Sequence, residues 1–359
     1  MRKIFILIPA DHPHGPVKGA YALANALSTK REVTLVTVKQ GPGAETPLSP
    51  NVTKLCLADT ETNSLGKVSF YKGLLARAGG RKAVSSISMC FSADAINALC
   101  SRHAITCSSV RGNLLANYRL DYGIKGTFLA ITHLASLRAF DTIVAMTKAM
   151  AKQIKQYSNR DSKIIGNFID ETSLRQFQCT ESPTGSYRFT FVGSLSERKQ
   201  PWLLIEAAAS IVESGYANIE LHFIGDGPLR NRLKEESQRF KVEEKIHIHG
   251  FLKNPYKILS NTDAMVLPSL SEGLPRAALE AMYLGAPCIL RQVDGNSELV
   301  RDGINGKLFN HDHELPKAMI EAMDLRRNRQ VNSSISLLPQ EYSQEKGAKA
   351  FLELIESIR

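Results

Sequence analysis

The chain has 359 residues, of which 43% are hydrophobic and 22% charged, and it carries a formal net charge of +10. This length exceeds what a single core usually serves, so two domains are expected, and no apolar run approaches the roughly 18 residues that cross a bilayer. The six cysteines show no C-x-x-C spacing, which argues against a zinc site or a disulfide framework and favours reduced thiols in a cytoplasmic protein.

Predicted strands and helices alternate along the first half of the chain. Apolar runs of strand length are followed by runs with helical periodicity. The expected strands are residues 3–8, 33–38, 53–57, 104–109 and 142–146, and a helix is expected at 17–28.

The positive charge is concentrated in this half. Residues 1–168 contain 22 Lys or Arg and 9 Asp or Glu, a net charge of +13, whereas residues 169–359 contain 23 and 26, a net charge of −3. Such asymmetry favours an anionic ligand or surface. Because no helix-turn-helix, RNA-binding or zinc-finger pattern accompanies the charge, an anionic membrane surface is preferred and nucleic acid is not expected.

Segment 67–82 has the pattern of an interfacial helix. Its apolar residues Phe70, Tyr71, Leu74 and Leu75 can share one face, and each cation near an anionic leaflet contributes about 1 kcal/mol. A basic surface helix is an equally good interpretation of this segment alone, and the charge of the first half favours membrane contact. The segment contains five cations and no acid: Lys67, Lys72, Arg77, Arg81 and Lys82.

After residue 186 the alternation begins again, which is typical of a second doubly wound parallel sheet in an α/β fold. The domain boundary is expected in the polar segment 169–186. This predicts a domain over 1–168, a second over 169–340 and a terminal amphipathic helix over 341–359. The strands expected in the second half are residues 188–192, 219–224, 246–249, 264–268 and 288–290, and the helices are 201–214, 228–239 and 276–284.

The most informative segment is 269–295, SLSEGLPRAALEAMYLGAPCILRQVDG. Two carboxylates, Glu272 and Glu280, stand eight residues apart, and Gly273-Leu274-Pro275 opens a helix between them. A helix start beside a glycine is a natural anion site. The alternative is a helix-dipole charge followed by a solvated glutamate.

The whole segment resembles the Glu-x7-Glu signature of the retaining glycosyltransferases of family 4. The resemblance implies the GT-B fold, in which two Rossmann-like domains face a central cleft and the terminal helix crosses back to the first domain. It also implies that Glu272 lies at the donor sugar, beside Gly273, Leu274 and Pro275, and that Glu280 binds the ribose of the sugar nucleotide.

The loop Gly193-Ser194-Leu195-Ser196-Glu197-Arg198-Lys199 is similar to the family loop whose arginine and lysine bind the donor diphosphate. Lys199 falls on the lysine position, whereas Ser194 stands at the arginine position. Either Arg198 supplies the second cation, or the diphosphate is held by Lys199, helix dipoles and a hydroxyl.

Four further positions are assigned by resemblance. Gly15 belongs to the glycine-rich loop that faces the cleft in the family, and Arg111 stands where many relatives carry a cleft histidine. A cation there would bind acceptor phosphates or the sugar. Gly250 and Phe251 occupy positions that surround the base in relatives, although Phe251 fits a hydrophobic core equally well.

No Asp-x-Asp string and no ligand-spaced cluster of carboxylates and histidines is evident, so no metal or other cofactor is expected. We therefore predict a metal-independent retaining glycosyltransferase with Glu272, Lys199 and Arg111 as its catalytic residues. Its donor would be a UDP-sugar, and its acceptor a lipid-linked or other glycan of bacterial surface polysaccharide or lipopolysaccharide (O-antigen) synthesis. The enzyme would lie peripherally on the cytoplasmic face of the membrane. The alternatives are a nucleotide-sugar epimerase of the same fold and a non-catalytic glycan- or lipid-binding relative.

Overall fold

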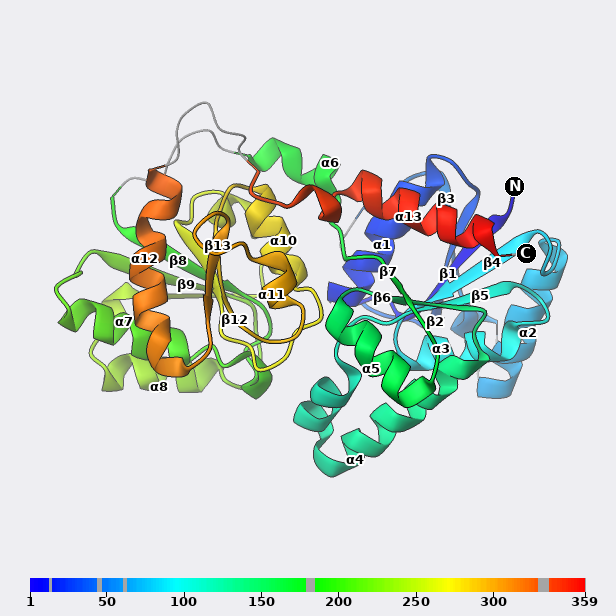
Figure 1. The fold of residues 1–359 in the computed structure, drawn as a ribbon, viewed down its shortest axis with the longest axis horizontal. Coiled ribbons are helices and arrows are strands. Elements are labelled where there is room, and N and C mark those ends of the chain that lie inside the picture. Colours follow the sequence, from blue (N-terminus) through cyan, green and yellow to red (C-terminus); the bar gives the residue numbers. More distant parts are fainter. Residues whose placement is uncertain (13–14, 44–46, 61–62, 179–184, 329–335, 359) are drawn as a thin grey trace. The chain divides into compact units, whose positions relative to one another are not determined.

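The computed structural model describes residues 1–12, 15–43, 47–60, 63–178, 185–328 and 336–358. The chain forms two compact units, one of Met1–Asp170 with Glu341–Arg359 and the other of Glu171–Gln340 (Figure 1). Residues 179–184 of the predicted boundary segment lie outside the described residues.

The first unit contains a parallel sheet of seven strands in the order β3-β2-β1-β4-β5-β6-β7. Its strands are β1 (Lys3–Ala10), β2 (Val33–Lys39), β3 (Val52–Cys56), β4 (Val84–Ser88), β5 (Ile105–Ser109), β6 (Thr142–Ala145) and β7 (Lys163–Ile164). Its helices are α1 (Gly15–Ser28), α2 (Ser64–Arg77), α3 (Phe91–Asn97), α4 (Leu114–Ser136), α5 (Lys148–Ser158) and α13 (Gln344–Ser357).

The second unit contains a parallel sheet of six strands in the order β10-β9-β8-β11-β12-β13. Its strands are β8 (Tyr187–Val192), β9 (Ile219–Ile224), β10 (Ile246–Gly250), β11 (Ala264–Leu267), β12 (Cys288–Arg291) and β13 (Gly306–Phe309). Its helices are α6 (Glu171–Leu174), α7 (Leu203–Glu213), α8 (Arg230–Arg239), α9 (Tyr256–Leu259), α10 (Arg276–Tyr283), α11 (Asn296–Leu299) and α12 (Leu315–Arg327).

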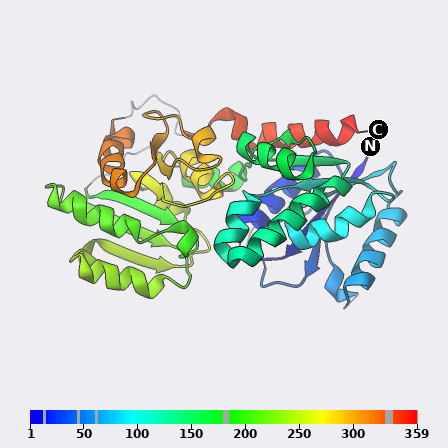
Figure 2. The ribbon, with the colours of Figure 1, turned by 60° about the horizontal axis from the view of Figure 1, so that its bottom comes forward.

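Both sheets are doubly wound, which confirms the predicted α/β class with two Rossmann-like sheets (Figure 2). The strand order reverses between β1 and β4 in the first unit and between β8 and β11 in the second. At such a reversal the loops that follow the two neighbouring strands diverge and leave a crevice at the carboxyl ends of the strands, where ligands of this fold class bind.

The first sheet is covered on both faces, because successive residues of β1 enter different cores. Ile4, Ile6 and Ile8 pack with side chains of α1 and α13, whereas Phe5 and Leu7 pack with side chains of α2 and α3. Such burial on both faces is typical of the strands of parallel sheets.

Helix α2 packs on the sheet through the apolar face that the sequence pattern predicted to contact a membrane. Tyr71 and Leu75 are fully buried in the core, and Phe70 and Leu74 pack against it. Arg81, one of the five cations, donates two hydrogen bonds of 2.8 Å to Asp141. The interfacial-helix interpretation of 67–82 is therefore wrong, because the apolar face belongs to the hydrophobic core.

No helix within the described residues is both long and apolar enough to cross a membrane. The five cysteines in this part of the chain, Cys56, Cys90, Cys100, Cys107 and Cys288, are free thiols.

The terminal helix α13 is part of the first unit. Phe351, Leu354 and Ile355 are buried in the core that α1 also lines. Gly347 permits a close approach, because a Cβ there would lie 2.2 Å from the ring of Phe168. The guanidinium of Arg2 donates a 2.6 Å hydrogen bond to the carbonyl of Ile355, so the two ends of the chain are joined within this unit.

We expect Phe351→Ala to lower the free energy of unfolding by about 3–5 kcal/mol, because it leaves a cavity under α13. Glu353→Ala, at an exposed position of the same helix, should change it by less than about 0.5 kcal/mol. Urea denaturation followed by circular dichroism measures both. Equal, small effects would show that α13 contributes little to the stability of the first unit.

Candidate functional site

The candidate site lies where the strand order of the second sheet reverses. The loop after β8 carries Lys199, and the loop after β11 carries Glu272. Because β8 and β11 are adjacent and parallel, both loops lie at the carboxyl ends of the strands, on the same side of the sheet's end. Topology therefore brings together two residues that are far apart in the sequence.

Three contacts join these loops. The amide of Leu270 donates to the carbonyl of Arg198 at 2.9 Å, and the guanidinium of Arg198 donates to the carbonyl of Ser271 at 3.1 Å. The ammonium of Lys199 forms an ion pair with the carboxylate of Glu272, and both side chains are largely buried. The loop after β8 (residues 193–199, the cationic loop) and the loop after β11 (residues 268–275, the acidic loop) are thus bound to each other.

Ser194 is exposed at the rim of the cationic loop, with its hydroxyl 3.3 Å from that of Ser196. Arg198 binds the acidic loop through Ser271, so its guanidinium fastens the two loops together.

Two glycines allow the neighbouring loop to approach Gly193 and Leu195 closely. A Cβ at Gly225 would lie 1.8 Å from the carbonyl oxygen of Gly193, and one at Gly227 would lie 2.5 Å from that of Leu195. Both glycines have φ angles in the region that disfavours side chains, +141° and +157°. The backbone of the loop after β9 therefore packs directly against the backbone of the cationic loop.

Helix α10 places Glu280 behind the acidic loop. Pro275 is the N-cap and not the first residue of the helix, which begins at Arg276. The helix ends at Tyr283, and Leu284 is its C-cap. The next residue, Gly285, has a φ of 88°, and the amides of Gly285 and Ala286 donate to the carbonyls of Met282 and Ala281, the Schellman pattern.

The carboxylate of Glu280 is buried and paired. It accepts a 2.9 Å hydrogen bond from Arg276, one turn earlier, and both side chains are less than 10% exposed. The alternative of a solvated mid-helix glutamate is therefore wrong.

Two residues that hold the loops were missed by sequence reasoning. Asp294, at φ 44°, accepts hydrogen bonds from the hydroxyl of Ser271 at 2.7 Å and from the amide of Glu272 at 3.0 Å. Arg291, at the end of β12, donates to the carbonyl of Pro268 at 3.0 Å and to the side chain of Gln200 at 3.1 Å. The only feature of the sequence that could have indicated these two residues is the polar turn that directly follows a buried strand.

The remaining predicted site residues lie beside these loops or in the other unit. The carbonyl of Gly250 accepts a 2.8 Å hydrogen bond from Gly225, and Phe251 is 50% exposed, so it is not a core residue. Gly15 begins α1 of the first unit, where a Cβ would meet no atom within 4 Å. Arg111, also in the first unit, donates a 2.6 Å hydrogen bond to Asn167 and lies against Gly19.

The first unit also contains a buried polar network that the sequence did not reveal. Asp94 and His133, both 1% exposed at the side chain, are joined at 2.7 Å, and the other nitrogen of His133 lies 3.1 Å from the hydroxyl of Tyr118. The hydroxyls of Ser88 and Ser108 donate to the two oxygens of Asp94. Burial raises the pKa of Tyr118, so its hydroxyl remains protonated. The network fastens α4 to the ends of β4 and β5.

Residues 173–335 match the family model described as "Glycosyl transferases group 1". The matched segment contains Lys199, Glu272, Glu280 and the residues that hold them. The second unit is therefore a glycosyltransferase group 1 domain.

Curated relatives show similarity over part of the chain. An uncharacterised glycosyltransferase of Methanocaldococcus jannaschii is 29% identical over 191 residues, 50% of this chain and 46% of the relative. The UDP-Gal:alpha-D-GlcNAc-diphosphoundecaprenol alpha-1,3-galactosyltransferase of Escherichia coli is 38% identical over 126 residues, 34% of this chain and 33% of the relative. The chain thus matches less than half the length of either relative.

Solved structures resemble the whole chain. The crystal structure of Anabaena HepE in complex with UDP and glucose has a TM-score of 0.74 and 18% identity, and the likeness covers 99% of this chain and 100% of that one. At this identity the likeness shows the fold alone, and it confirms the predicted GT-B class.

Asp294→Gly should test whether this carboxylate holds the acidic loop, because glycine keeps the left-handed backbone without strain and removes both hydrogen bonds. We expect the free energy of unfolding to fall by about 3–6 kcal/mol, since each of the two hydrogen bonds to this charged group contributes about 1.5–3 kcal/mol. Asp294→Asn, which tolerates the same backbone and keeps an acceptor oxygen, should retain most of the stability. Chemical denaturation distinguishes the two, and equal losses would contradict this role.

Proposed function

We propose that this protein is a retaining glycosyltransferase that transfers a sugar from a UDP-sugar to a glycan acceptor. The observation that carries the proposal is the Lys199–Glu272 ion pair at the reversal of strand order, inside a glycosyltransferase group 1 domain. The complexes of Anabaena HepE with UDP and with UDP-glucose support a uridine nucleotide as donor. The group transfer that we infer leaves the anomeric configuration unchanged, as the family resemblance implies.

In this reaction the bond between the anomeric carbon and the diphosphate breaks, and negative charge develops on the departing diphosphate. Lys199 would stabilise that charge together with the N-terminus of α10, whose dipole attracts anions. Glu272 orients Lys199 through their ion pair and would contact the donor sugar. Glu280 would bind the ribose while Arg276 holds its carboxylate in place. This arrangement needs no metal ion to neutralise the diphosphate.

We infer that the acceptor is a lipid-linked glycan of bacterial surface polysaccharide synthesis. The printed names of relatives support this inference, because one acts on a diphosphoundecaprenol-linked sugar and another is a lipopolysaccharide 1,6-galactosyltransferase of Salmonella typhimurium. Arg111 in the first unit would bind acceptor phosphates.

The proposal is tested by incubating the protein with UDP-, GDP- and dTDP-sugars without added Mg²⁺ or Mn²⁺ and measuring nucleotide release. We expect slow hydrolysis of a UDP-sugar alone and faster release when a suitable acceptor is present. Epimerisation without nucleotide release would favour the epimerase alternative. Binding to a glycan without turnover of any donor would favour the non-catalytic alternative.

Lys199→Ala should lower turnover about 10²–10³-fold, because the leaving diphosphate carries more charge in the transition state than in the bound donor. Lys317→Ala, at an exposed position of the same unit, is the matched control and should leave turnover unchanged. Thermal unfolding of both variants shows whether the fold is intact. A folded Lys199→Ala variant with normal turnover would contradict the assignment.

We further infer that the protein binds an anionic membrane through α4. Beyond the bend at Gly123, Ile124, Phe128 and Ile131 follow the spacing of one helix face. Ile124 is 79% and Phe128 71% exposed. The bent helix lies at the margin of its unit in Figure 1.

The charge around α4 favours a lipid surface over another apolar partner. Arg119 and Lys125 are exposed on the same helix, against one exposed acid, Asp121, and the helix belongs to the half of the chain whose net charge is +13. Cations beside an exposed apolar face are the pattern of an interfacial helix.

Replacing Ile124 and Phe128 together with Ser should weaken binding to anionic vesicles at least about 10-fold, since about 0.8 kcal/mol is lost per buried CH₂. Leu65→Ser, at an 83% exposed position of α2, is the control and should bind normally. Binding measured by vesicle flotation should fall with salt, because exposed charges are screened over about 8–10 Å. Equal binding to neutral vesicles, or none to any vesicle, would contradict the membrane contact.

A further inference from the structure

Four metal-ligating side chains lie on one face of the second sheet, outside the loops described above. Because side chains alternate along a strand, Glu220 and His222 of β9 point to the same face, and so do His247 and His249 of β10. The parallel register pairs His247 with His222. Since β10 is the edge strand of the sheet, this cluster lies at the edge.

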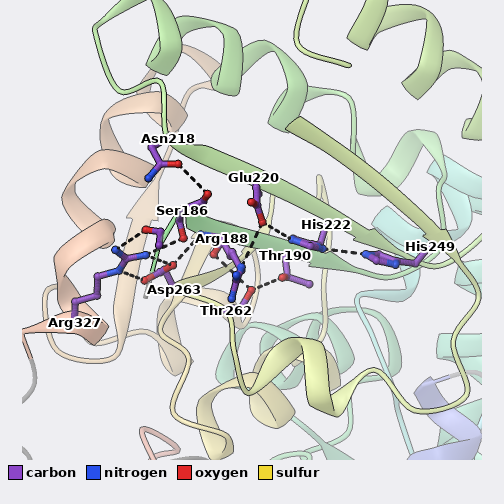
Figure 3. A network of polar contacts seen from close by, with 11 residues as sticks. Ser186, Arg188, Thr190, Asn218, Glu220, His222, His249, Thr262, Asp263 and Arg327 are labelled. Atoms are coloured by element: carbon purple, nitrogen blue, oxygen red, sulfur yellow. Dashed lines mark hydrogen bonds and ion pairs between the residues drawn. The ribbon is translucent and has the colours of Figure 1, made fainter. Parts of the chain in front are cut away.

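The side chains are in mutual contact. The ring centroids of His222 and His247 are 4.8 Å apart, and those of His222 and His249 are 5.2 Å apart. Nδ1 of His222 lies 3.0 Å from Nε2 of His249, and Nε2 of His222 lies 3.5 Å from Oε2 of Glu220 (Figure 3). One ligand atom from each of Glu220, His222 and His247 lies within 4.8 Å of the others.

The inner nitrogen of this cluster has no well-formed hydrogen bond. Nε2 of His222 is buried, and its 3.5 Å contact with Oε2 of Glu220 is longer than a normal hydrogen bond, although leaving such an atom unpaired costs about 1–3 kcal/mol. A metal ion ligated by this nitrogen, the carboxylate and the neighbouring imidazole would satisfy all three groups.

We propose that Glu220, His222 and His247 form a binding site for a divalent transition-metal ion of the Zn²⁺ class. Two imidazoles and a carboxylate are a common zinc ligand set, and small side-chain rotations would bring them to Zn–N and Zn–O bonds of about 2.0–2.2 Å. Imidazole ligands select such ions over Mg²⁺ and Ca²⁺. The cluster corrects the sequence expectation that no carboxylates and histidines stand at ligand spacing.

His249 and Arg188 position the ligands. For Nε2 of His222 to ligate the ion, Nδ1–H of His222 must donate to Nε2 of His249, which lies 3.0 Å away and so would fix the required tautomer. Nε of Arg188 lies 3.3 Å from the carboxylate of Glu220. Partners of this kind orient metal ligands and tune their affinity. Because the ligands come from β9 and β10, the bound ion would join the edge strand to its neighbour and stabilise the second unit.

The test uses tag-free full-length protein, freed of metal with a chelator and desalted. Zn²⁺ is titrated against a chromogenic chelator, and thermal unfolding is followed with Zn²⁺ or Mg²⁺. We expect one Zn²⁺ per chain at micromolar or tighter affinity and a higher melting temperature with Zn²⁺ but not with Mg²⁺, because an ion that binds only the folded state stabilises it. The titration measures Zn²⁺ binding directly, so its result does not depend on whether the protein transfers a sugar.

His247→Gln removes an exposed ligand and should weaken Zn²⁺ binding at least about 100-fold, whereas His249→Gln should weaken it about 10–100-fold. His313→Gln is the matched control, because His311 and His313 are also stacked, at 5.6 Å, without belonging to a group of three ligands among the described residues. No binding by the wild type at 100 µM Zn²⁺, wild-type affinity of His247→Gln, or an equal loss in His313→Gln would overturn the proposal.

Discussion

The arrangement of the candidate site depends on one topological constraint, the adjacency of β8 and β11 in the second sheet. The strand order reverses there, so the chain leaves the two neighbouring strands in different directions and the loops enclose a crevice. Lys199 and Glu272 meet only because of this adjacency. If the strands were ordered by sequence, β9 and β10 would separate the loops that now form an ion pair.

Buried polar contacts then hold each loop in place. Asp294 and Arg291, both from the end of β12 or just beyond it, bind the acidic loop, and Arg198 joins it to the cationic loop. Removing paired charges from water is costly, so such contacts are weak evidence for stability. Their effect is to fix the position of groups that would act on a charged substrate, where preorganised charges are most effective. The Arg276–Glu280 pair does the same for the carboxylate behind the loop.

The apolar faces of two helices in the first unit show why amphipathicity alone does not identify a membrane surface. Helix α2 has four apolar residues on one face, Phe70, Tyr71, Leu74 and Leu75, and five cations nearby, yet these apolar residues complete the hydrophobic core. Helix α4 shows no comparable basic run in the sequence, but beyond the bend at Gly123 its residues Ile124 and Phe128 are exposed to solvent. The periodicity of a helix determines which side chains share a face, whereas the sheet beneath determines which face remains exposed.

The sequence alone determined the alternation of strands and helices, and thereby the α/β class and the two doubly wound sheets. It also predicted, by resemblance to a family motif whose glycines, proline and acids are local features, that Lys199, Glu272 and Glu280 act together, and the structure brings Lys199 and Glu272 into contact. It missed β4, whose serines are buried in a polar network with Asn97 and so lack the usual apolar pattern. Only the tertiary structure decided that Arg198 fastens the loops, that Asp294 holds Glu272, and that Glu220, His222 and His247 converge. These contacts join segments distant in sequence, and their partners depend on strand order and register, which local periodicity does not encode.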